Sequence, residues 1–550
     1  MSSERILMVA LYYVQPGVSP AIPLFYATRS HVSNSTWAWT SDPFFVQGRL
    51  IQPGLIERTM YGPGKLRGAS SVAAGAIVLS NADGALDSIL PESFDGQQFL
   101  LYDIDPATLT VRTLLRRGYI EQPTWDDKSI TFQVRDTLHA LDVNLLTTKY
   151  AGTNALPAGI EGTADDIGGT PKPMLLGTCK NATPKQVNTS KKIYQIDGVR
   201  GLKAGYTLAV YDKRAVVTQD GAGDYTSQAD MENNANIPAV GQYRVWPAGG
   251  CFRINFTPAG ALTCDVTNPA DKRTGGVAAL KDVLYTLNGD ILGSRSPDQS
   301  LGFLPAGQLY ANNPDVGIYV DDSRTALSAV QELMTSAGAF VVSDFPLDYT
   351  YAGNVLNASQ LYEPTSTPHY LAPLELNESR IVPDSLRLVP PSESDRGLPV
   401  WRVNVQYAKN WTPMTENDLA GVAAADVAYF TQEYRTAKAE DASVKTDWPA
   451  ALELTVTTLI VDEADAVAEA NRLLDLFGVP RQRFAVRVPL LVILTQAKTS
   501  GGTLYPDAFG IGAPITLKLP RFGLDAGKRF VVTEMRQDYE GEVVDLILWG

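Results

Sequence analysis

The C-terminal part of the chain, residues 461–550, changes its hydrophobic period partway along, and this change most constrains the fold. Apolar residues recur at spacings of three and four from Ala466 to Phe477, so they share one face of an amphipathic helix. Gly478 and Pro480 then end the helix. From Arg483 to Val488 the period is two, which predicts a strand with alternate residues on opposite faces.

Two further strand-like runs close the sequence. Arg529–Met535 and Val543–Trp549 are joined by Asp538–Gly541, which is a hairpin signal. The sequence ends directly after the second run, at Trp549 and Gly550. We therefore expect the last strand to be built into a sheet or barrel.

The order of these pieces resembles the C-terminal part of the tail hub proteins of tailed bacteriophages. In that family a helix ends in a short turn, barrel strands and a second turn follow, and the chain ends in Leu-Trp-Gly. The corresponding segments here are Leu476–Arg481, Pro520–Leu524 and Leu548–Gly550. No catalytic group lies in this pattern, so it indicates a fold and an assembly role.

Three blocks nearer the N-terminus strengthen the resemblance. Gly75–Asp87, together with Phe94–Gly96, is similar to a block near the start of hub-like tail proteins of long-tailed phages. Val210–Asp212 and Phe252–Gly260 are similar to a further block of such proteins. The blocks occur in the expected order and sample both ends and the middle of the chain.

The resemblance implies a structural hub of a tail tip or baseplate, and not an enzyme. In the family, two β-barrel domains per subunit pack around a threefold axis, so that a homotrimer forms a ring of six barrels. The ring joins the distal tail-tube proteins to tip or fibre proteins, and its channel passes the tape-measure protein and then DNA during genome ejection. The protein would be made in the host cytoplasm and end in the virion. Phe477, Phe522 and Trp549 would be core or interface anchors.

Composition agrees with a large, strand-rich, acidic protein. With 550 residues, 45% of them apolar, the chain is long enough for several domains with their own cores. Its formal net charge of −14 argues against sequence-specific nucleic-acid binding, which needs clustered lysine and arginine. An acidic channel would instead let DNA pass without specific binding, because it repels phosphate.

We predict a multidomain α+β fold that is mainly β. The four expected domains are an N-terminal β-barrel-like hub domain (1–150), an inserted β-rich module (151–275), an α+β module (276–380), and a C-terminal α+β module with the second β-barrel (381–550). The composition of Ala151–Pro173, rich in Gly, Pro, Thr and Asp, indicates a loop or linker between the first two. No stable membrane segment is expected, because the apolar run Ile6–Val14 is better explained as a first strand than as a signal peptide.

Local patterns place further elements along the chain. Gly84 follows Asp83 in a predicted tight turn. Asp321–Ser323 would cap a helix that Gly338 ends. The predicted helices are Asp136–Leu146, Val277–Asn288, Ala326–Ser336 and Asp418–Glu433. The main predicted strands are Ala76–Leu79, Phe99–Tyr102, Val111–Leu115, Gly118–Glu121, Ser129–Val134, Ile193–Ile196, Thr207–Tyr211, Tyr243–Trp246, Cys251–Phe256, Ala339–Val342 and Trp401–Tyr407.

Motifs that could carry chemistry are weak, and we predict no catalytic, cofactor-binding or metal-binding residue and no cofactor. The three histidines, His31, His139 and His369, form no recognisable catalytic or metal-ligand spacing. The segment Gly62–Leu66 lacks the full phosphate-loop spacing and is better explained as a turn. Cys179, Cys251 and Cys264 lack a zinc spacing and are predicted to be buried free thiols, although the last two could be neighbours.

Two other functions stay open. Trp37 and Trp39 place two indoles on one side of a predicted strand, with Tyr12 and Tyr13 as possible neighbours, so a receptor-binding or carbohydrate-binding tail protein is the first alternative. It requires a concave aromatic patch in residues 180–270. The second is a peptidoglycan hydrolase, which needs two carboxylates roughly 5–10 Å apart across a cleft. Adjacent acidic pairs such as Asp126-Asp127, Asp321-Asp322 and Asp462-Glu463 more often cap helices or solvate loops.

Overall fold

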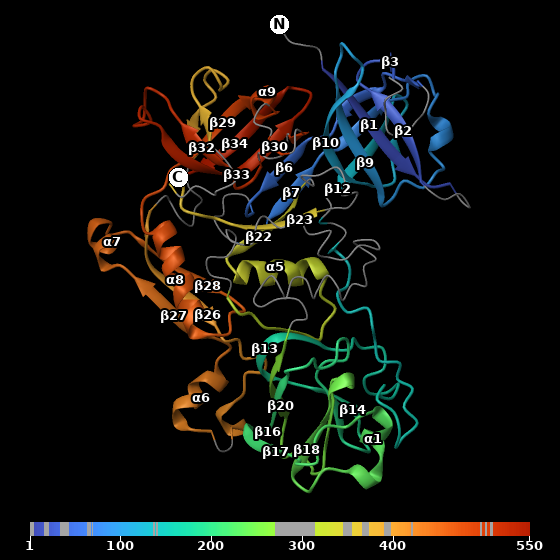
Figure 1. The fold of residues 1–550 in the computed structure, drawn as a ribbon, viewed down its shortest axis with the longest axis vertical. Coiled ribbons are helices and arrows are strands. Elements are labelled where there is room, and N and C mark those ends of the chain that lie inside the picture. The colour runs from blue at the N-terminus through green and yellow to red at the C-terminus, as the bar shows by residue number, and fades with distance from the viewer. Residues whose placement is uncertain are drawn as a thin grey trace.

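The fold is α+β and mainly β, with several sheets, as predicted (Figure 1). Two curled eight-stranded sheets lie side by side at one end, a nine-stranded sheet lies at the other, and a layer of helices and short sheets lies between them. The computed structural model describes residues 5–15, 21–33, 43–62, 68, 70–135, 138, 141–269, 314–344, 355–365, 373–389, 398–419, 422–494, 498–500, 503–505 and 510–550.

The first eight-stranded sheet is built from the N-terminal segment. Its strands run in the spatial order β2 (Ile22–Ala27), β1 (Ile6–Tyr13), β9 (Gln97–Ile104), β10 (Val111–Ile120), β12 (Ser129–Arg135), β8 (Ala76–Ser80) and β5 (Leu50–Pro53), with β11 (Thr124–Trp125) beside β12. The predicted first strand is therefore confirmed. The prediction of two strands at Val111–Leu115 and Gly118–Glu121 is wrong, because β10 is one strand that two register shifts bend without ending it. A Cβ at Gly118 would meet the Phe99 ring at 2.6 Å, so the glycine serves close packing within the strand.

The second eight-stranded sheet is built mainly from the C-terminal segment. Its path is β24 (Leu374–Leu376), β32 (Pro514–Leu517), β33 (Lys528–Asp538), β34 (Val543–Trp549), β29 (Arg483–Pro489) and β25 (Arg387–Leu388). The predicted strands and their hairpin are confirmed, and the last strand lies inside the sheet. Two strands of the N-terminal segment, β6 (Ile56–Thr59) and β7 (Ser71–Ala74), extend this sheet because β6 pairs with the second half of β33.

The two eight-stranded sheets share one hydrophobic core. A single cluster of buried side chains contains Phe94, Phe99 and Phe132 from the first sheet and Phe484 and Phe530 from the second. Several of these rings meet edge to face, with centroids 5.0 Å apart for Phe94 and Phe132 and 5.6 Å apart for Phe484 and Phe530. Because no polar layer separates the clusters of the two sheets, we expect them to fold as one unit.

The nine-stranded sheet forms from residues 174–268 and one later strand. Its order is β14 (Lys185–Asn188), β15 (Ile193–Gln195), β19 (Cys251–Ile254), β18 (Gln242–Trp246), β17 (Ala215–Gln219), β16 (Thr207–Asp212), β20 (Leu262–Asn268), β13 (Met174–Ala182) and β21 (Ile318–Val320). The strands predicted here are confirmed. The short helix α1 (Gln228–Glu232) lies beside the sheet (Figure 1).

One pair of strands forms the wall between this module and the rest of the chain. On β13, Leu175 belongs to the core of the nine-stranded sheet, whereas Met174 and Leu176 belong to a second large cluster in the middle layer. On the paired strand β21, Tyr319 and its neighbours alternate in the same way. Because alternate residues of each strand face opposite sides, each strand contributes side chains to both cores.

The middle layer contains the helix α5 (Ala326–Ser336), whose bounds are as predicted. Its cap is not in Asp321–Ser323: the Thr325 hydroxyl accepts the Ser328 amide at 3.2 Å, because Asp322 is engaged by Arg324 instead. Gly338 follows in the left-handed region and leads to the confirmed strand β22 (Ala339–Asp344), which pairs with β23 (Val355–Gln360).

A three-stranded sheet lies beside α5. It consists of β27 (Arg435–Glu440), β26 (Val400–Tyr407) and β28 (Leu452–Thr457), and it packs against the predicted helix α8 (Glu463–Phe477). The helix ends at Gly478, as expected. The helix predicted over Asp418–Glu433 is shorter: α6 covers Ala424–Thr431, because a Thr415–Asp418 side-chain bond of 2.7 Å holds the preceding residues in a turn. The remaining short elements are α7 (Ala442–Asp447), α9 (Leu490–Leu494), β3 (His31–Val32), β4 (Phe45–Val46), β30 (Lys498–Ser500) and β31 (Thr503–Tyr505).

Other predictions have mixed outcomes. Ala151–Pro173 is a loop, as predicted, and it packs on the nine-stranded sheet. Of the predicted helix Asp136–Leu146, the described residues Leu138 and Leu141 have a 3-10 helical conformation and residues 142–146 are not helical. Its four leucines belong to the core under α5. The predicted helix Val277–Asn288 lies outside the described residues. In the part of the chain that the structure describes, we find no helix long and apolar enough to span a membrane.

Candidate functional site: an assembly surface

Two of the sequence blocks that carry the hub resemblance, Leu476–Arg481 and Leu548–Gly550, meet in space at the end of the second eight-stranded sheet. The Phe477 ring at the end of α8 contacts the buried Trp549 ring edge to face, with centroids 5.8 Å apart. The Arg481 guanidinium lies 5.1 Å from the same ring. Gln482 and Gly550 exchange two backbone hydrogen bonds of 2.7 and 3.1 Å. The helix end and the chain end therefore form one joint, although about seventy residues separate them in sequence.

The three anchor residues predicted here have different surroundings. Trp549 is fully buried, and Phe477 is half-buried against it, as expected of core anchors. Phe522 is 63% exposed, which excludes a core position, and its role as an interface anchor stays a prediction. It lies at a left-handed position of the turn before Leu524, which is the buried apolar residue of that block.

The block Gly75–Asp87 specifies a turn. The Asn81 amide donates to Asp87 at 2.8 Å, and its oxygen accepts the Leu86 amide at 2.8 Å. Gly84 has a φ of +66°, which a side chain would strain. The exposed Asp83 is bound by both terminal nitrogens of Arg49, at 2.7 and 2.8 Å, and this hydrogen bonding holds the pKa of the Asp83 carboxyl well below its usual range. The block therefore encodes geometry, and no chemistry.

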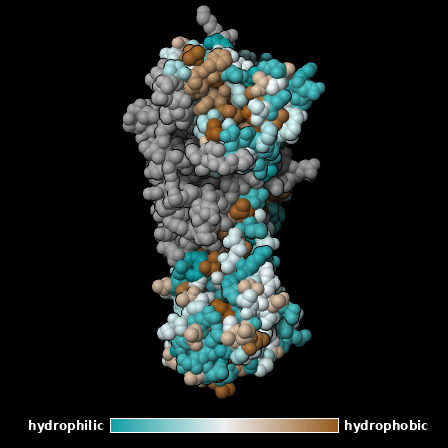
Figure 2. Space-filling model, turned by 90° about the vertical axis from the view of Figure 1, so that its right-hand side faces the viewer, coloured by the Kyte–Doolittle hydropathy of each residue, from teal (hydrophilic) through white to brown (hydrophobic). Residues whose placement is uncertain are grey.

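An apolar surface lies on the outer side of the first eight-stranded sheet. Val32 on β3 and Phe45 on β4 are directly paired across the two strands, and they are 54% and 63% exposed. Beside them β2, an edge strand, is half-buried along Ile22–Phe25 and apolar on both faces. Figure 2 shows apolar side chains gathered on this upper part of the molecule. We call β2, β3 and β4 the apolar face; such edges and patches are typical of interfaces.

A charged groove of about 590 Å³ lies on the outer face of the second eight-stranded sheet. Its floor carries charges that alternate across four neighbouring strands, in the order Glu57, Arg536, Asp545 and Arg487. Arg487 binds Asp545 through two bonds of 2.7 and 2.9 Å. Because the signs alternate, the groove has no excess of one charge that would select an ionic ligand.

The two central carboxylates of the groove are not a free pair of the kind that a hydrolase needs. Asp545 and Glu534 are both held by arginines, and the Glu534 pair with Arg483 spans 2.7 Å. Of the acidic pairs noted in sequence, Asp126 accepts two amides of its own turn, and Asp322 pairs with Arg324.

Where the structure describes them, the remaining candidate groups do not assemble into a site. His31 is buried on β3, whereas His139, His369, the tryptophans at 37 and 39 and most of the Gly62–Leu66 segment lie outside the described residues. All three cysteines are buried and free, as predicted, and Cys251 lies in a different hydrophobic cluster from Cys264. Burial raises the pKa of each thiol, to about 12 for Cys251, so these thiols are poor nucleophiles. Among the described residues, we find no group of side chains suited to a metal ion.

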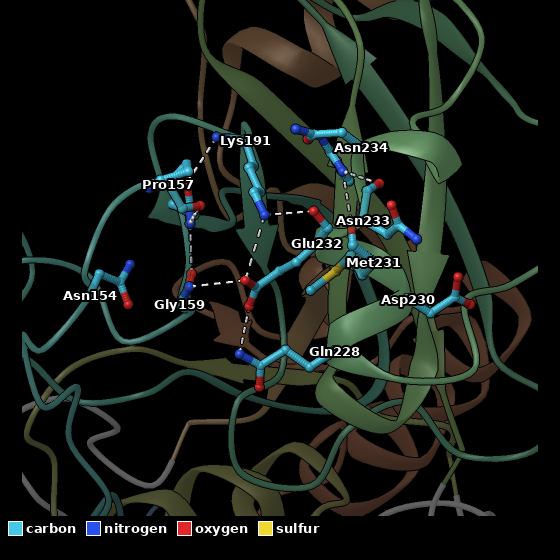
Figure 3. Close-up of polar contacts among 12 residues, drawn as sticks. Asn154, Pro157, Gly159, Lys191, Gln228, Asp230, Met231, Glu232, Asn233 and Asn234 are labelled. Carbon is cyan, nitrogen blue, oxygen red and sulfur yellow. Dashed lines mark hydrogen bonds and ion pairs between the residues drawn. The ribbon is translucent and has the colours of Figure 1, made fainter.

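Polar contacts in the nine-stranded module fasten its own parts together. Glu232, at the end of α1, accepts from the Gly159 amide at 3.2 Å and from the Gln228 side chain at 2.7 Å (Figure 3). Lys191 donates to the Glu232 carbonyl at 2.6 Å, and its ammonium lies 3.7 Å from the carboxylate. Asn188 holds the same loop through the carbonyls of Pro157 and Gly159. The network joins the loop, the helix and the β14–β15 turn.

The module does not present the aromatic patch that a sugar-binding role would need. Residues 180–269 are all described, and their exposed large apolar side chains are the aliphatic Val216, Ile237 and Val240. The aromatic rings pack inward: Tyr194 stacks on Phe252 with centroids 5.6 Å apart. Sequence reasoning gave no signal for this, because a strand pattern does not say which face an aromatic residue takes at a sheet end.

Comparison with known proteins gives distant structural likenesses. No family model matches the chain, and no curated protein sequence matches it. A tail protein from Neisseria meningitidis MC58 is 10% identical, with 93% of this chain and 94% of that chain covered and a TM-score of 0.38. The 43 kDa tail protein of prophage MuSo2 from Shewanella oneidensis is 9% identical, with 99% and 96% covered and a TM-score of 0.37. Prophage tail protein gp18 from Listeria monocytogenes EGD-e is 7% identical, with 99% and 94% covered and the same TM-score. At these TM-scores the likeness carries no argument about this chain.

Proposed function

We propose that this protein is a structural subunit of a bacteriophage tail, and specifically a hub of the tail tip or baseplate without catalytic activity. The observation that carries the proposal is the joint at Trp549, where the end of α8 packs against the last strand of the second eight-stranded sheet. Because these two resembling segments pack on each other, their order supports one folded unit.

The paired eight-stranded sheets support an assembly role. Two curled sheets that share a core supply two barrel-like units per subunit, which is what a ring of six units from three chains requires. The exposed Val32 and Phe45 pair supplies an apolar contact beside an edge strand. In this proposal the apolar face packs on a neighbouring copy, and tail-tube proteins, tip or fibre proteins and the tape-measure protein are the further partners.

The proposal predicts the behaviour of the purified chain. Light scattering should give a mass of three times 59.5 kDa at micromolar concentration, and Phe45→Asp should shift the protein toward monomers without changing its thermal unfolding. Leu388→Asp is the matched control, because that leucine is 60% exposed but lies on β25, at the edge of the other eight-stranded sheet. A monomer at every concentration tested, also in the presence of tail-tube protein, would contradict the ring.

The alternatives receive less support. A carbohydrate-binding role needs exposed aromatic rings in residues 180–270, where the exposed large apolar side chains are aliphatic. A peptidoglycan hydrolase needs a free carboxylate pair, and the central carboxylates of the groove are bound by arginines. Incubation with purified peptidoglycan tests the hydrolase alternative directly, because release of reducing sugar would support it.

A further inference from the structure

The connection between β26 and β27 is far longer than the strands require. Tyr407 and Arg435 are cross-strand partners at the end of this antiparallel pair, so a turn of a few residues could join them. The chain instead makes an excursion over residues 408–434. Figure 1 shows that α6, within this excursion, lies down beside the nine-stranded sheet and away from the three-stranded sheet that the excursion leaves and re-enters. We call residues 408–434 the strap.

The first contact of the strap is with β13. Asn410 forms an isolated parallel bridge with Lys180, and the Trp411 amide donates to the Lys180 carbonyl at 3.1 Å. The hydroxyls of Thr412 and Thr183 are 2.8 Å apart. The strap therefore continues the hydrogen bonding of the nine-stranded sheet for a short distance.

Two fully buried amides hold this contact together. Asn181 lies in the left-handed region, at a bulge that interrupts the pairing of β13, and it donates to the Asn410 oxygen at 2.8 Å. Asn410 in turn donates to the carbonyls of Phe430 and Gln432, at 2.9 and 3.0 Å, on the far side of the strap. Removing the Asn410 amide would break its bonds to Asn181 and to both strap carbonyls at once, although Asn181 also donates to the Thr412 carbonyl and Phe430 also accepts the Met414 amide.

A strained turn forms the second contact. Asp212 and Ala215 pair across a two-residue hairpin whose central residues, Lys213 and Arg214, have φ values of +49° and +64°. This geometry favours asparagine and glycine, because a Cβ crowds the backbone at positive φ. Something outside the hairpin must therefore stabilise lysine and arginine there.

The compensating contacts of Arg214 involve the strap. Its guanidinium is stacked between the rings of Tyr211 and Phe430, 3.6 and 4.1 Å from their centroids. It also donates two bonds to the Asp265 carboxylate, at 3.0 and 3.3 Å, and it is buried. Phe430 belongs to α6 of the strap, whereas Tyr211 and Asp265 belong to the nine-stranded sheet. Half of the stack is thus lost if the strap leaves.

We propose that the strap is a lock that fixes the nine-stranded module in one orientation relative to the rest of the chain, with Arg214 as its latch. The stacking on Phe430 offsets the strain of the turn in the locked state, and this contribution is lost when the strap leaves. The lock is a property of the isolated chain and does not depend on the proposed tail function. In a tail tip, the lock would keep the module in a fixed orientation relative to the hub.

The test measures the orientation of the module directly. Spin labels at Val240→Cys, which is 85% exposed near the module tip, and at Asp447→Cys on α7 report the distance between the two bodies. The three native cysteines are buried and should stay unlabelled. The locked protein gives one narrow distance distribution in a pulsed electron resonance experiment.

Two latch variants and one control separate the lock from a general loss of stability. Arg214→Ala and Phe430→Ala should each broaden the distribution and speed amide exchange in the strap by about tenfold or more. Arg244→Ala is the control, because this arginine also lies over an aromatic ring, that of Tyr225 at 4.2 Å, but contacts only the module itself. It should leave both readouts unchanged.

Phe430→Ala keeps the test decisive if Arg214→Ala fails to fold, since it removes the same stack from the side of the strap. A distribution as narrow in both latch variants as in the parent, with unchanged exchange in the strap, would overturn the proposal. A broad distribution in the parent protein would overturn it as well.

Discussion

The paired eight-stranded sheets and the nine-stranded module are joined to the rest of the chain in different ways. The two eight-stranded sheets share one apolar cluster, in which rings from both pack edge to face. The nine-stranded sheet keeps its own clusters, and its contact with the strap combines buried amides and one arginine with the Trp411 ring, which packs against Tyr319. The strands β13 and β21 serve both a module core and the middle-layer core, and Trp411 also packs against both.

The two joints should therefore respond differently to substitutions. A continuous apolar core has no plane along which it can open without exposing large side chains to water, so the paired sheets should unfold together. A polar joint depends on a few directional contacts, so a single substitution can open it while both sides stay folded. The predictions below use this difference.

The largest effect is expected from Phe530→Ala. Phe530 is fully buried in the shared core, so its loss should lower the free energy of unfolding by about 3–5 kcal/mol. Amide exchange should rise in strands of both eight-stranded sheets. Denaturation in urea measures the first effect and exchange mass spectrometry the second. Destabilisation confined to the C-terminal sheet would show that the two sheets are separate units; the exposed Phe522→Ala should change neither readout.

The next effect concerns pH at the wall of the module. Burial raises the pKa of Asp197 to about 6, although its carboxylate accepts amides of Leu175, Val199 and Arg200. The Asp197 carboxyl therefore stays protonated in the folded state at pH values where the unfolded state has released the proton. Its contribution to stability is present below pH 4 and is lost as the pH rises to about 6. Over that pH range, the free energy of unfolding of the parent should fall by up to about 3 kcal/mol relative to that of Asp197→Asn.

Urea denaturation at a series of pH values measures this difference between parent and variant. Asp126→Asn is the control of opposite sign. Hydrogen bonds from the Lys128 and Ser129 amides lower the pKa of Asp126, so its contribution is lost as pH falls. If the free energies of unfolding of the parent and of Asp197→Asn change with pH in parallel, ionisation of Asp197 does not destabilise the folded state.

A smaller effect is expected from Asn410→Ala. It removes the side-chain donor to the Gln432 carbonyl and one of the acceptors of the buried Asn181 amide, at a cost of about 1–3 kcal/mol. The loss should appear as a separate, earlier transition of the module in calorimetry. Asn404→Ala removes an exposed amide of the neighbouring β26 and should leave a single transition. A single thermal transition in both variants would mean that the strap contacts do not decide whether the module unfolds together with the rest of the chain.

The smallest effect is expected on the groove floor. Arg487 and Asp545 form an ideal two-bond pair, but both are substantially exposed to solvent, so Arg487→Ala should change stability by less than about 1 kcal/mol. The buried Arg483→Ala should cost more, because it leaves Glu534 unpaired at the sheet surface. Equal effects of the two substitutions, measured by urea denaturation, would contradict this ranking.

Local sequence patterns predicted the elements that a single period defines. The helices α5 and α8 and the strands β29, β33 and β34 follow from the spacing of their own apolar residues. The elements that failed depend on distant partners. Gly118 stays in a strand because Phe99 packs over it, and α6 begins late because Thr415 and Asp418 form a turn.

The assembly surface and the lock were less accessible to sequence reasoning. Nothing near Ile56–Thr59 shows that this strand joins β33, more than four hundred residues away. The Lys213-Arg214 turn also lacks the asparagine and glycine that mark such hairpins, and its explanation, Phe430, lies far along the chain. The joint at Trp549 could be anticipated only through the resemblance, because the segments that meet there are individually ordinary.

The central claim is that the chain is a structural subunit at the tip of a phage tail. Gold-labelled antibody against the purified protein, applied to intact phage particles from the source strain, tests it most directly by electron microscopy. We predict label confined to the distal end of the tail. Label on the capsid, or particles that carry no label at all, would contradict the account.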